Sequence, residues 1–196
     1  MKLFKLTALA SLCFALTSTI ISCEKDSEKD KVNAYSKSDI PVTGAQVAPV
    51  ASPSAGLGSL SVSYDKRVGI INYSLTWSGL SDSVIAIRVC GPAPVGYPIL
   101  NPSFTGANPT GITTTPYIVL QELNGVTTQA PTKAFRPSTG SYTGTLLVDG
   151  VKVRQQDLLN GLYFITVHTK TTLPVSGSGA FLYRWFGEIR GQIRFD

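Results

Sequence analysis

The sequence is poor in the side chains that build catalytic and metal centres. It has one histidine, three cysteines and 12 acidic residues among 196 residues. A single histidine excludes sites built from several imidazoles. The acids after residue 55 are few and not clustered, so paired catalytic carboxylates are not expected. No G-x-S-x-G segment and no phosphate-binding loop occurs, so serine hydrolase and nucleotide-hydrolysing functions have no support.

Positive charge is in modest excess and is not concentrated anywhere. Lysine and arginine number 17, which gives a formal net charge of +5. No run of basic residues is present, and nucleic-acid-binding proteins depend on such a patch. We therefore expect no nucleic-acid partner.

The N-terminus is typical of a lipoprotein signal peptide. Lys2 and Lys5 begin it, and the uncharged, mainly apolar run from Leu6 to Ile21 is too short for a spanning helix. The run ends in the lipobox pattern Ile20-Ile21-Ser22-Cys23, with a small residue before the cysteine. The Cys23 thiol is the side chain that can form the diacylglycerol thioether. We predict cleavage before Cys23 and a palmitate-bearing lipid anchor.

Cysteine usage agrees with an anchored, exported protein. Cys13 lies in the leader and Cys23 at the lipid site, so Cys90 alone remains for the folded part and cannot form an internal disulfide. Glu24 follows the lipid site, so the common Asp signal for inner-membrane retention is absent. We expect a protein of the cell envelope, held on the outer membrane by its N-terminal lipid and facing the periplasm or the surface.

Composition divides the chain into three regions. Residues 1–22 are the signal peptide, 23–55 a lipidated flexible tether, and 56–196 a folded domain. The tether begins with alternating charges and continues with prolines among small residues. Such composition buries too little apolar area to offset the ordering of the chain.

The folded domain is dominated by period-two alternation. The clearest strand has Ile71, Tyr73, Leu75 and Trp77 on one face and polar residues on the other. Similar runs are at 60–64, 83–90, 117–123, 142–148, 162–169 and 184–195. A short helical turn is expected at Val153 to Leu159. Seven or so short strands without long helices predict an antiparallel sandwich or barrel.

One long segment lacks this alternation. Gly91 to Pro116 contains six prolines and four glycines. Proline removes a donor from a strand ladder, so the segment is expected to be a surface excursion and not a central strand. A loop of this length is a candidate contact surface for a protein or glycan ligand.

The C-terminal third carries the motifs of a known family. The quoted segments are Gly140 to Leu146, Asp157 to Gly161, Val167-His168-Thr169 and Gly187-Glu188-Ile189-Arg190-Gly191-Gln192-Ile193. Together they resemble the CHRD domain, named for chordin and widespread in bacterial secreted proteins. The resemblance extends over roughly residues 57 to 196. It implies an immunoglobulin- or superoxide-dismutase-like antiparallel sandwich of about seven to nine strands, with no established enzymatic activity.

The chain departs from the family at two histidines. The family pattern A-H-I-H-G-P-A corresponds here to residues 87–93, so Arg88 and Cys90 replace the histidines. Alternation places Arg88 and Cys90 on one face of their strand, and likewise His168 with Thr166. Glu188 is the fourth candidate member of this cluster.

Two interpretations of the cluster remain open. Cys90, His168 and Glu188 are suitable ligands for Cu or Zn, although a guanidinium beside a divalent cation is unfavourable. In the alternative, Arg88 pairs with Glu188 and orients His168 in a polar network that holds strands together. A Cys90–His168 nucleophilic pair has no local signature and no basic cluster to lower the thiol pKa.

Taken together, these features predict a lipid-anchored, non-catalytic binding or adhesion module without a cofactor. A metal-binding or redox-related envelope domain is the alternative. A purely structural envelope protein also fits the sequence.

Overall fold

A computed structural model describes residues 32–48, 51–97, 103–105, 108–110, 118–123, 136–171 and 186–196. Within these residues, eight strands form one sheet in the order β7-β4-β9-β10-β1-β2-β3-β8. The strands are β1 (Ala34–Thr43), β2 (Leu57–Asp65), β3 (Ile70–Ser78), β4 (Val84–Gly91), β7 (Ile118–Leu123), β8 (Gly140–Leu147), β9 (Phe164–Thr169) and β10 (Ile189–Gln192). The predicted all-β antiparallel fold is confirmed.

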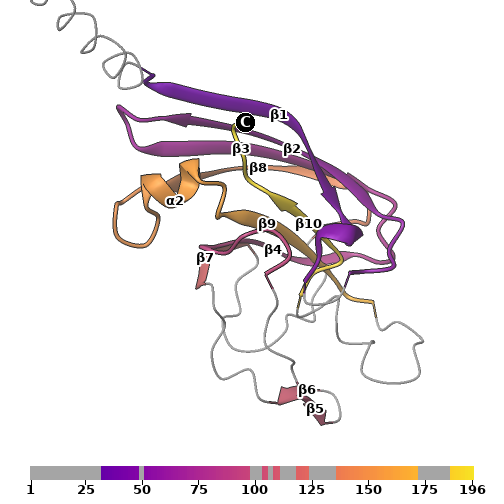
Figure 1. Cartoon of the computed structure of the whole chain (residues 1–196). Helices are drawn as coiled ribbons and strands as arrows, with labels where there is room; N and C mark the ends of the chain where they lie inside the picture. The colour runs from indigo at the N-terminus through magenta and orange to yellow at the C-terminus, as the bar shows by residue number, and fades with distance from the viewer. Residues whose placement is uncertain are drawn as a thin grey trace, which may run out of the picture. The chain divides into compact units, whose positions relative to one another are not determined.

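The sheet folds over itself so that its two halves face each other (Figure 1). Strands β1, β2, β3 and β8 form one layer, and β4, β7, β9 and β10 form the other. The two end strands approach each other through Gln121 on β7. Its side chain accepts a hydrogen bond from Tyr73 Oη at 2.8 Å and donates to the Thr145 carbonyl at 3.2 Å. The sandwich is therefore a nearly closed sheet.

The hydrophobic core lies between these layers, where alternation placed it. Ile71, Tyr73, Leu75 and Trp77 on β3 are at most 4 % exposed. Trp77 also donates its indole N–H to the Pro137 carbonyl at 3.0 Å. Trp77 therefore packs in the core, together with the other side chains on its face of β3.

Close approach of backbones explains the glycines of the last strand. A Cβ on Gly191 would lie 2.6 Å from Val42 Cγ2, so only glycine fits between β10 and β1. Gly187 has φ +94, a conformation that other residues rarely adopt. The turn precedes β10, which spans Ile189–Gln192 within the predicted range 184–195, and residues 184 and 185 lie outside the described part of the chain.

The folded domain begins earlier than the sequence predicted. β1 and the short 3-10 helix η2 (Gly44–Gln46) lie inside the segment 23–55, which was predicted to be a flexible tether. Ile40 and Val42 are 7 % and 0 % exposed, so this part of the prediction is wrong. In the sequence, these two apolar residues lie among prolines and small polar residues, so no strand pattern is evident. They are buried because β1 lies between β10 and β2, which are distant in sequence.

The predicted helical turn is confirmed as α2 (Gln155–Leu159). It ends at Asn160, and the following Gly161 has φ +68, which is the expected stop signal. Among the described residues, no helix combines the length and apolar character needed to cross a membrane.

The proline-rich excursion adds no strand to the main sheet in its described parts. Its two short strands, β5 (Ser103–Thr105) and β6 (Asn108–Thr110), pair only with each other. The charged segment 24–31 and most of the loop after Lys170 lie outside the described residues, together with Trp185.

Candidate functional site

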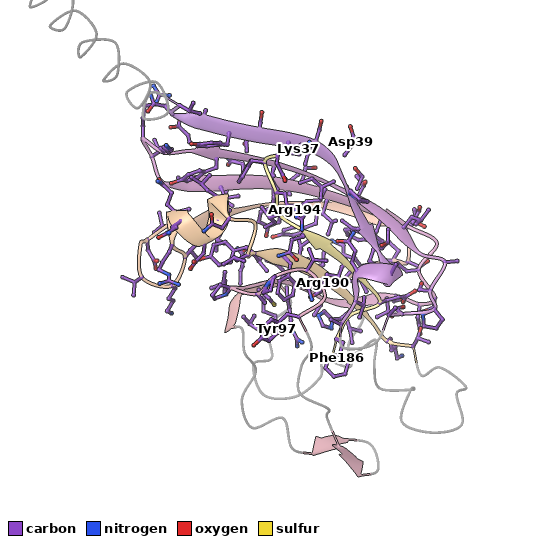
Figure 2. All side chains as sticks on the ribbon, in the orientation of Figure 1. Lys37, Asp39, Tyr97, Phe186, Arg190 and Arg194 are labelled. Carbon is purple, nitrogen blue, oxygen red and sulfur yellow. The ribbon has the colours of Figure 1, made fainter. Side chains whose placement is uncertain are left out.

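The candidate residues named from sequence lie on one buried face of the β4–β9–β10 layer. Antiparallel register pairs Ala86 with His168 and Arg88 with Thr166, which puts these side chains on the same face. Side chains that alternate with these are apolar and buried on the other face: Ile85, Ile87, Val89, Ile165 and Val167. We call the set on this face the polar layer: Arg88, Cys90, Glu122, Thr166, His168, Glu188, Arg190 and Gln192. Figure 2 labels Arg190 on the side of the layer away from β1.

Arg88 has a different partner from the one predicted. Its Nε donates to Glu122 Oε2 at 2.9 Å, and the two side chains are 13 % and 10 % exposed. The residues stand directly opposite each other in the β4–β7 ladder. The predicted Arg88–Glu188 pair is therefore wrong. The reason is that β7 lies beside β4 at the end of the sheet and places the Glu122 carboxylate directly opposite Arg88.

This ion pair gives a hydrogen-bond donor to only one of the two carboxylate oxygens of Glu122. Its Oε1 atom is buried and has no hydrogen-bond partner in the part of the chain that the structure describes. A buried acceptor without a donor carries a desolvation cost. The arrangement stabilises the β4–β7 edge through one oxygen of the carboxylate.

Glu188 is fully enclosed and holds three segments together. Its carboxylate accepts hydrogen bonds from the backbone N–H of Ser81 at 2.8 Å and from the Ser81 hydroxyl at 2.7 Å. The hydroxyls of Ser54 and Thr169 donate to it as well. With no exposed surface and four donors, Glu188 joins the segment before β2, the segment before β4 and the end of β9. Its role is structural.

His168 and Cys90 are both buried on this face and are separated along it. His168 Nε2 lies 2.8 Å from Thr166 Oγ1. In the β4–β9 register, His168 lies opposite Ala86 and Cys90 lies opposite Phe164. The side chains of His168 and Cys90 are therefore four residues apart, about 13 Å at 3.3 Å per residue. They do not form a nucleophilic pair.

Burial keeps the Cys90 thiol protonated. The side chain is 2 % exposed, and this burial raises its pKa to about 12. A reactive cysteine needs the opposite shift. Cys90 therefore behaves as a small apolar residue beside Phe164 and Ala93, with which it packs.

Arg190 and Gln192 fasten the start of the proline-rich excursion to this face. The Arg190 guanidinium lies 3.7 Å from the centre of the Phe164 ring and donates to the Pro94 carbonyl at 3.2 Å. Gln192 donates to the Ala93 carbonyl at 2.9 Å. These hydrogen bonds give the buried side chains of Arg190 and Gln192 acceptors, and they hold the backbone of residues 93 and 94 over the polar layer.

The donor set for a metal ion is not assembled. Among the described residues, no three His, Cys, Asp or Glu side chains lie close enough to hold a metal. Glu188 is occupied by four donors, and Cys90 and His168 are several residues apart on their strands. The polar layer is therefore packed as part of the domain's interior.

A cavity of about 1080 Å³ lies elsewhere, across β1, β2, β3 and β8, with one residue from β7. Hydroxyl side chains dominate its lining: Ser36, Ser38, Ser61, Ser63, Ser74, Thr143 and Thr145. Asn72 and Gln121 add amides. Among the described residues that line it, Lys37 is the charged one, and its Nζ donates to the Asp196 carbonyl at 2.5 Å.

Two tyrosines are also among the lining residues, but alternation puts their rings on the core face of β3 and β8, opposite the hydroxyl side chains. Tyr73 and Tyr142 have ring centres 6.3 Å apart and tilted by 32°. Burial raises the pKa of Tyr73, so its phenol stays protonated and donates to Gln121. Gly144 leaves room for this ring, because a Cβ there would lie 2.3 Å from Tyr73 Oη.

Sequence reasoning missed this cavity and half of the polar layer. The hydroxyls lie on alternate positions of recognised strands, which signals only a polar face. Their assembly depends on the order β1-β2-β3-β8, and no local pattern encodes that order. The sequence placed Glu122 in an expected strand, but it did not show that this strand lies beside β4 and pairs Glu122 with Arg88.

Comparison with known proteins agrees with the motifs. A family model described as the CHRD domain matches residues 39–173. The match begins within β1 and stops before the last strand, so it starts earlier and ends earlier than the motifs alone suggested. No curated protein and no solved structure matches the chain.

Proposed function

The chain belongs to the CHRD family, and from this premise we propose that it is a non-catalytic, glycan-binding module anchored to the bacterial cell envelope by lipid on Cys23. The cavity lined by hydroxyl groups carries the binding part of this proposal. The lipobox before Cys23 carries the anchoring part.

Size and shape favour a small or linear ligand. Ligand cavities commonly enclose about 300–1,000 Å³, and this one holds about 1080 Å³. It opens across paired strands, whose backbone groups are already used in the sheet ladders. A ligand must therefore be recognised by side chains.

The chemistry of the lining favours a neutral sugar. Serine and threonine hydroxyls both donate and accept hydrogen bonds, and amides do the same, which matches the hydroxyl groups of a glycan. Protein interfaces are centred on aromatic and other large apolar side chains, whereas the exposed side chains on this face are mainly short and polar.

The proposal leaves the polar layer without a catalytic role. Its carboxylate at Glu188 and its thiol at Cys90 are buried and held by neighbours. A general acid or nucleophile must reach its substrate. This arrangement supports a binding module over an enzyme.

A matched pair of substitutions tests the glycan site. Asn72 and Thr76 are exposed, and alternation places them on the same face of β3, but only Asn72 lines the cavity. We expect Asn72→Arg to weaken binding to neutral oligosaccharide arrays by at least about tenfold, roughly 1.4 kcal/mol. Thr76→Arg should leave binding unchanged. No binding by the unmodified protein, or equal loss in both variants, would contradict the proposal.

The anchor has a separate test. Cells supplied with labelled palmitate should incorporate it into the unmodified chain and not into Cys23→Ala. Fractionation should then place the unmodified chain with the outer membrane. Label in Cys23→Ala, or none in either chain, contradicts anchoring at this residue.

A further inference from the structure

Three exposed apolar side chains gather at one end of the sandwich. Val68, Leu147 and Val151 are 61 %, 60 % and 82 % exposed. Val68 lies in the turn between β2 and β3, Leu147 ends β8, and Val151 lies in the loop that follows. We call these three residues the end patch.

The loops that carry the end patch are joined to each other. Val148 donates its N–H to the Gly69 carbonyl at 2.8 Å, and Leu147 pairs with Ile70 across the β3–β8 ladder. Asp149 Oδ1 accepts hydrogen bonds from three successive backbone N–H groups, at residues 151, 152 and 153. The loop that presents Val151 is therefore ordered by its own aspartate.

A small excess of positive charge lies near the patch. The charged residues of these loops and of α2 are Lys66, Arg67, Lys152 and Arg154 against Asp65, Asp149 and Asp157, a sum of 4 − 3 = +1. Four of these residues form two ion pairs that are neutral as a whole, Asp65 with Arg67 at 2.9 Å and Asp157 with Arg154 at 2.7 Å. The remaining charges are Lys66 and Lys152 against Asp149. Lys152 is exposed beside Val151. Apolar side chains with basic neighbours suit an anionic lipid surface.

The start of β1 lies at this same end. Ser59 Oγ is 3.4 Å from Asp39 Oδ1, and Ser36 shares the cavity with Ser61 and Ser63. This spacing makes β1 antiparallel to β2, so the early residues of β1 lie near the end of β2 that leads into Val68. Figure 1 shows the β2–β3 turn and the loop before α2 at this end.

The chain from the lipid site to this end is short. Cys23 and Ser36 are 36 − 23 = 13 residues apart, which allows at most about 45 Å at 3.5 Å per residue. A short tether raises the local concentration of a surface so that weak contacts suffice. A membrane is therefore the surface that this end meets most often.

We propose that the end patch docks on the membrane, with Val68, Leu147 and Val151 entering the interface between headgroups and acyl chains. This proposal rests on the lipid anchor proposed above. Docking would orient the domain with β2 and β3 rising from the membrane. The opposite end of the sandwich would then point away from it.

A pair of probes at the two ends of β2 tests the orientation. Leu57 begins β2 and is 60 % exposed, against 61 % for Val68 just beyond the other end. The two sites are separated by about 30 Å, at roughly 3.3 Å per residue of strand. Val68→Cys and Leu57→Cys variants of the lipidated protein would each carry one environment-sensitive fluorophore. The native Cys90 is buried and stays unlabelled.

The proteins would be reconstituted on vesicles of phosphatidylethanolamine and phosphatidylglycerol with nitroxide-labelled acyl chains. The Val68 probe should be quenched at least about twofold more than the Leu57 probe, because only shallow insertion reaches the acyl chains. Adding Val151→Asp to the Val68 probe should lower its quenching to the level at Leu57.

The outcomes separate this proposal from the anchor. Equal quenching of both probes, in protein whose lipid is verified by mass spectrometry, overturns docking and leaves the anchor standing. Protein without lipid overturns the anchor itself. A Val68 probe that becomes buried with rising protein concentration in the absence of vesicles assigns the patch to a second copy and also overturns membrane docking.

Discussion

Arg88 and Glu122 face each other across the β4–β7 ladder, with the guanidinium Nε 2.9 Å from the carboxylate Oε2. The contact joins β4, where Arg88 and Cys90 replace the family's two histidines, to the edge strand after the proline-rich excursion. Both side chains are largely buried, so the attraction between the two charges compensates each of them for the loss of water. This dependence makes the pair a sensitive point of the fold.

Removing one member of the pair should destabilise the domain. We expect Glu122→Ala to lower the free energy of unfolding by about 3 kcal/mol, because Arg88 is left buried without its carboxylate. Urea unfolding of the purified chain measures this loss. The double variant Arg88→Met/Glu122→Leu should recover most of it, since apolar residues of similar volume need no partner. A double variant as unstable as Glu122→Ala would contradict this account of the pair.

Glu188 should matter for stability at least as much. Replacing it with alanine leaves the Ser81 N–H and three hydroxyl groups without their acceptor. We expect a loss of roughly 3 kcal/mol or more in the free energy of unfolding. The exposed acid Asp196 provides the control, and Asp196→Asn should change stability by less than about 0.5 kcal/mol. A Glu188→Ala protein as stable as this control would show that the carboxylate does not hold the three segments.

Glu122 and Glu188 also show which contacts could be predicted from the sequence and which could not. Alternation predicted β3, β4 and β9, and it put Arg88 with Cys90 on one face of their strand and His168 with Thr166 on one face of theirs, because period two is a local property. The partner of Arg88 depends on which strand lies beside β4, a long-range choice. Ser54 donates to Glu188 from a segment that composition alone marks as a linker. Partners that come from distant loops leave no periodic signal.

The Cys90 thiol gives stability a pH dependence with a definite sign. Burial raises its pKa from 9.0 to about 12 in the folded chain. Between these values the unfolded chain loses the proton and the folded chain keeps it, so stability falls as pH rises. The contribution is complete below about pH 9 and decreases by at most about 1.4 kcal/mol per pH unit above it.

Comparison with Cys90→Ala isolates this effect from the tyrosines. Burial raises the pKa of Tyr73 and Tyr163 as well, so some decline at high pH should remain in the variant. Urea unfolding between pH 8 and 11 should show a shallower decline for Cys90→Ala than for the unmodified chain. Identical slopes would show that the thiol is not buried in its neutral form.

Gly191 should not tolerate a side chain. A Cβ at this position would lie 2.6 Å from Val42 Cγ2 and 3.1 Å from the Pro41 carbonyl. We expect Gly191→Ala to cost about 1–3 kcal/mol in the free energy of unfolding, as overpacked cores do. Thermal melting of the variant would report the loss, and an unchanged melting temperature would contradict the close packing of β10 on β1.

The most direct measurement of the central claim is hydrogen exchange of the protein with and without a neutral oligosaccharide selected on the array. The cavity lies on β1, β2, β3 and β8, whereas the polar layer lies on β4, β9 and β10. A ligand in the cavity should slow exchange at residues 72–74 and 142–145 and leave 86–90 and 164–168 unchanged. Protection of the second group alone would place the ligand on the polar layer and contradict the account.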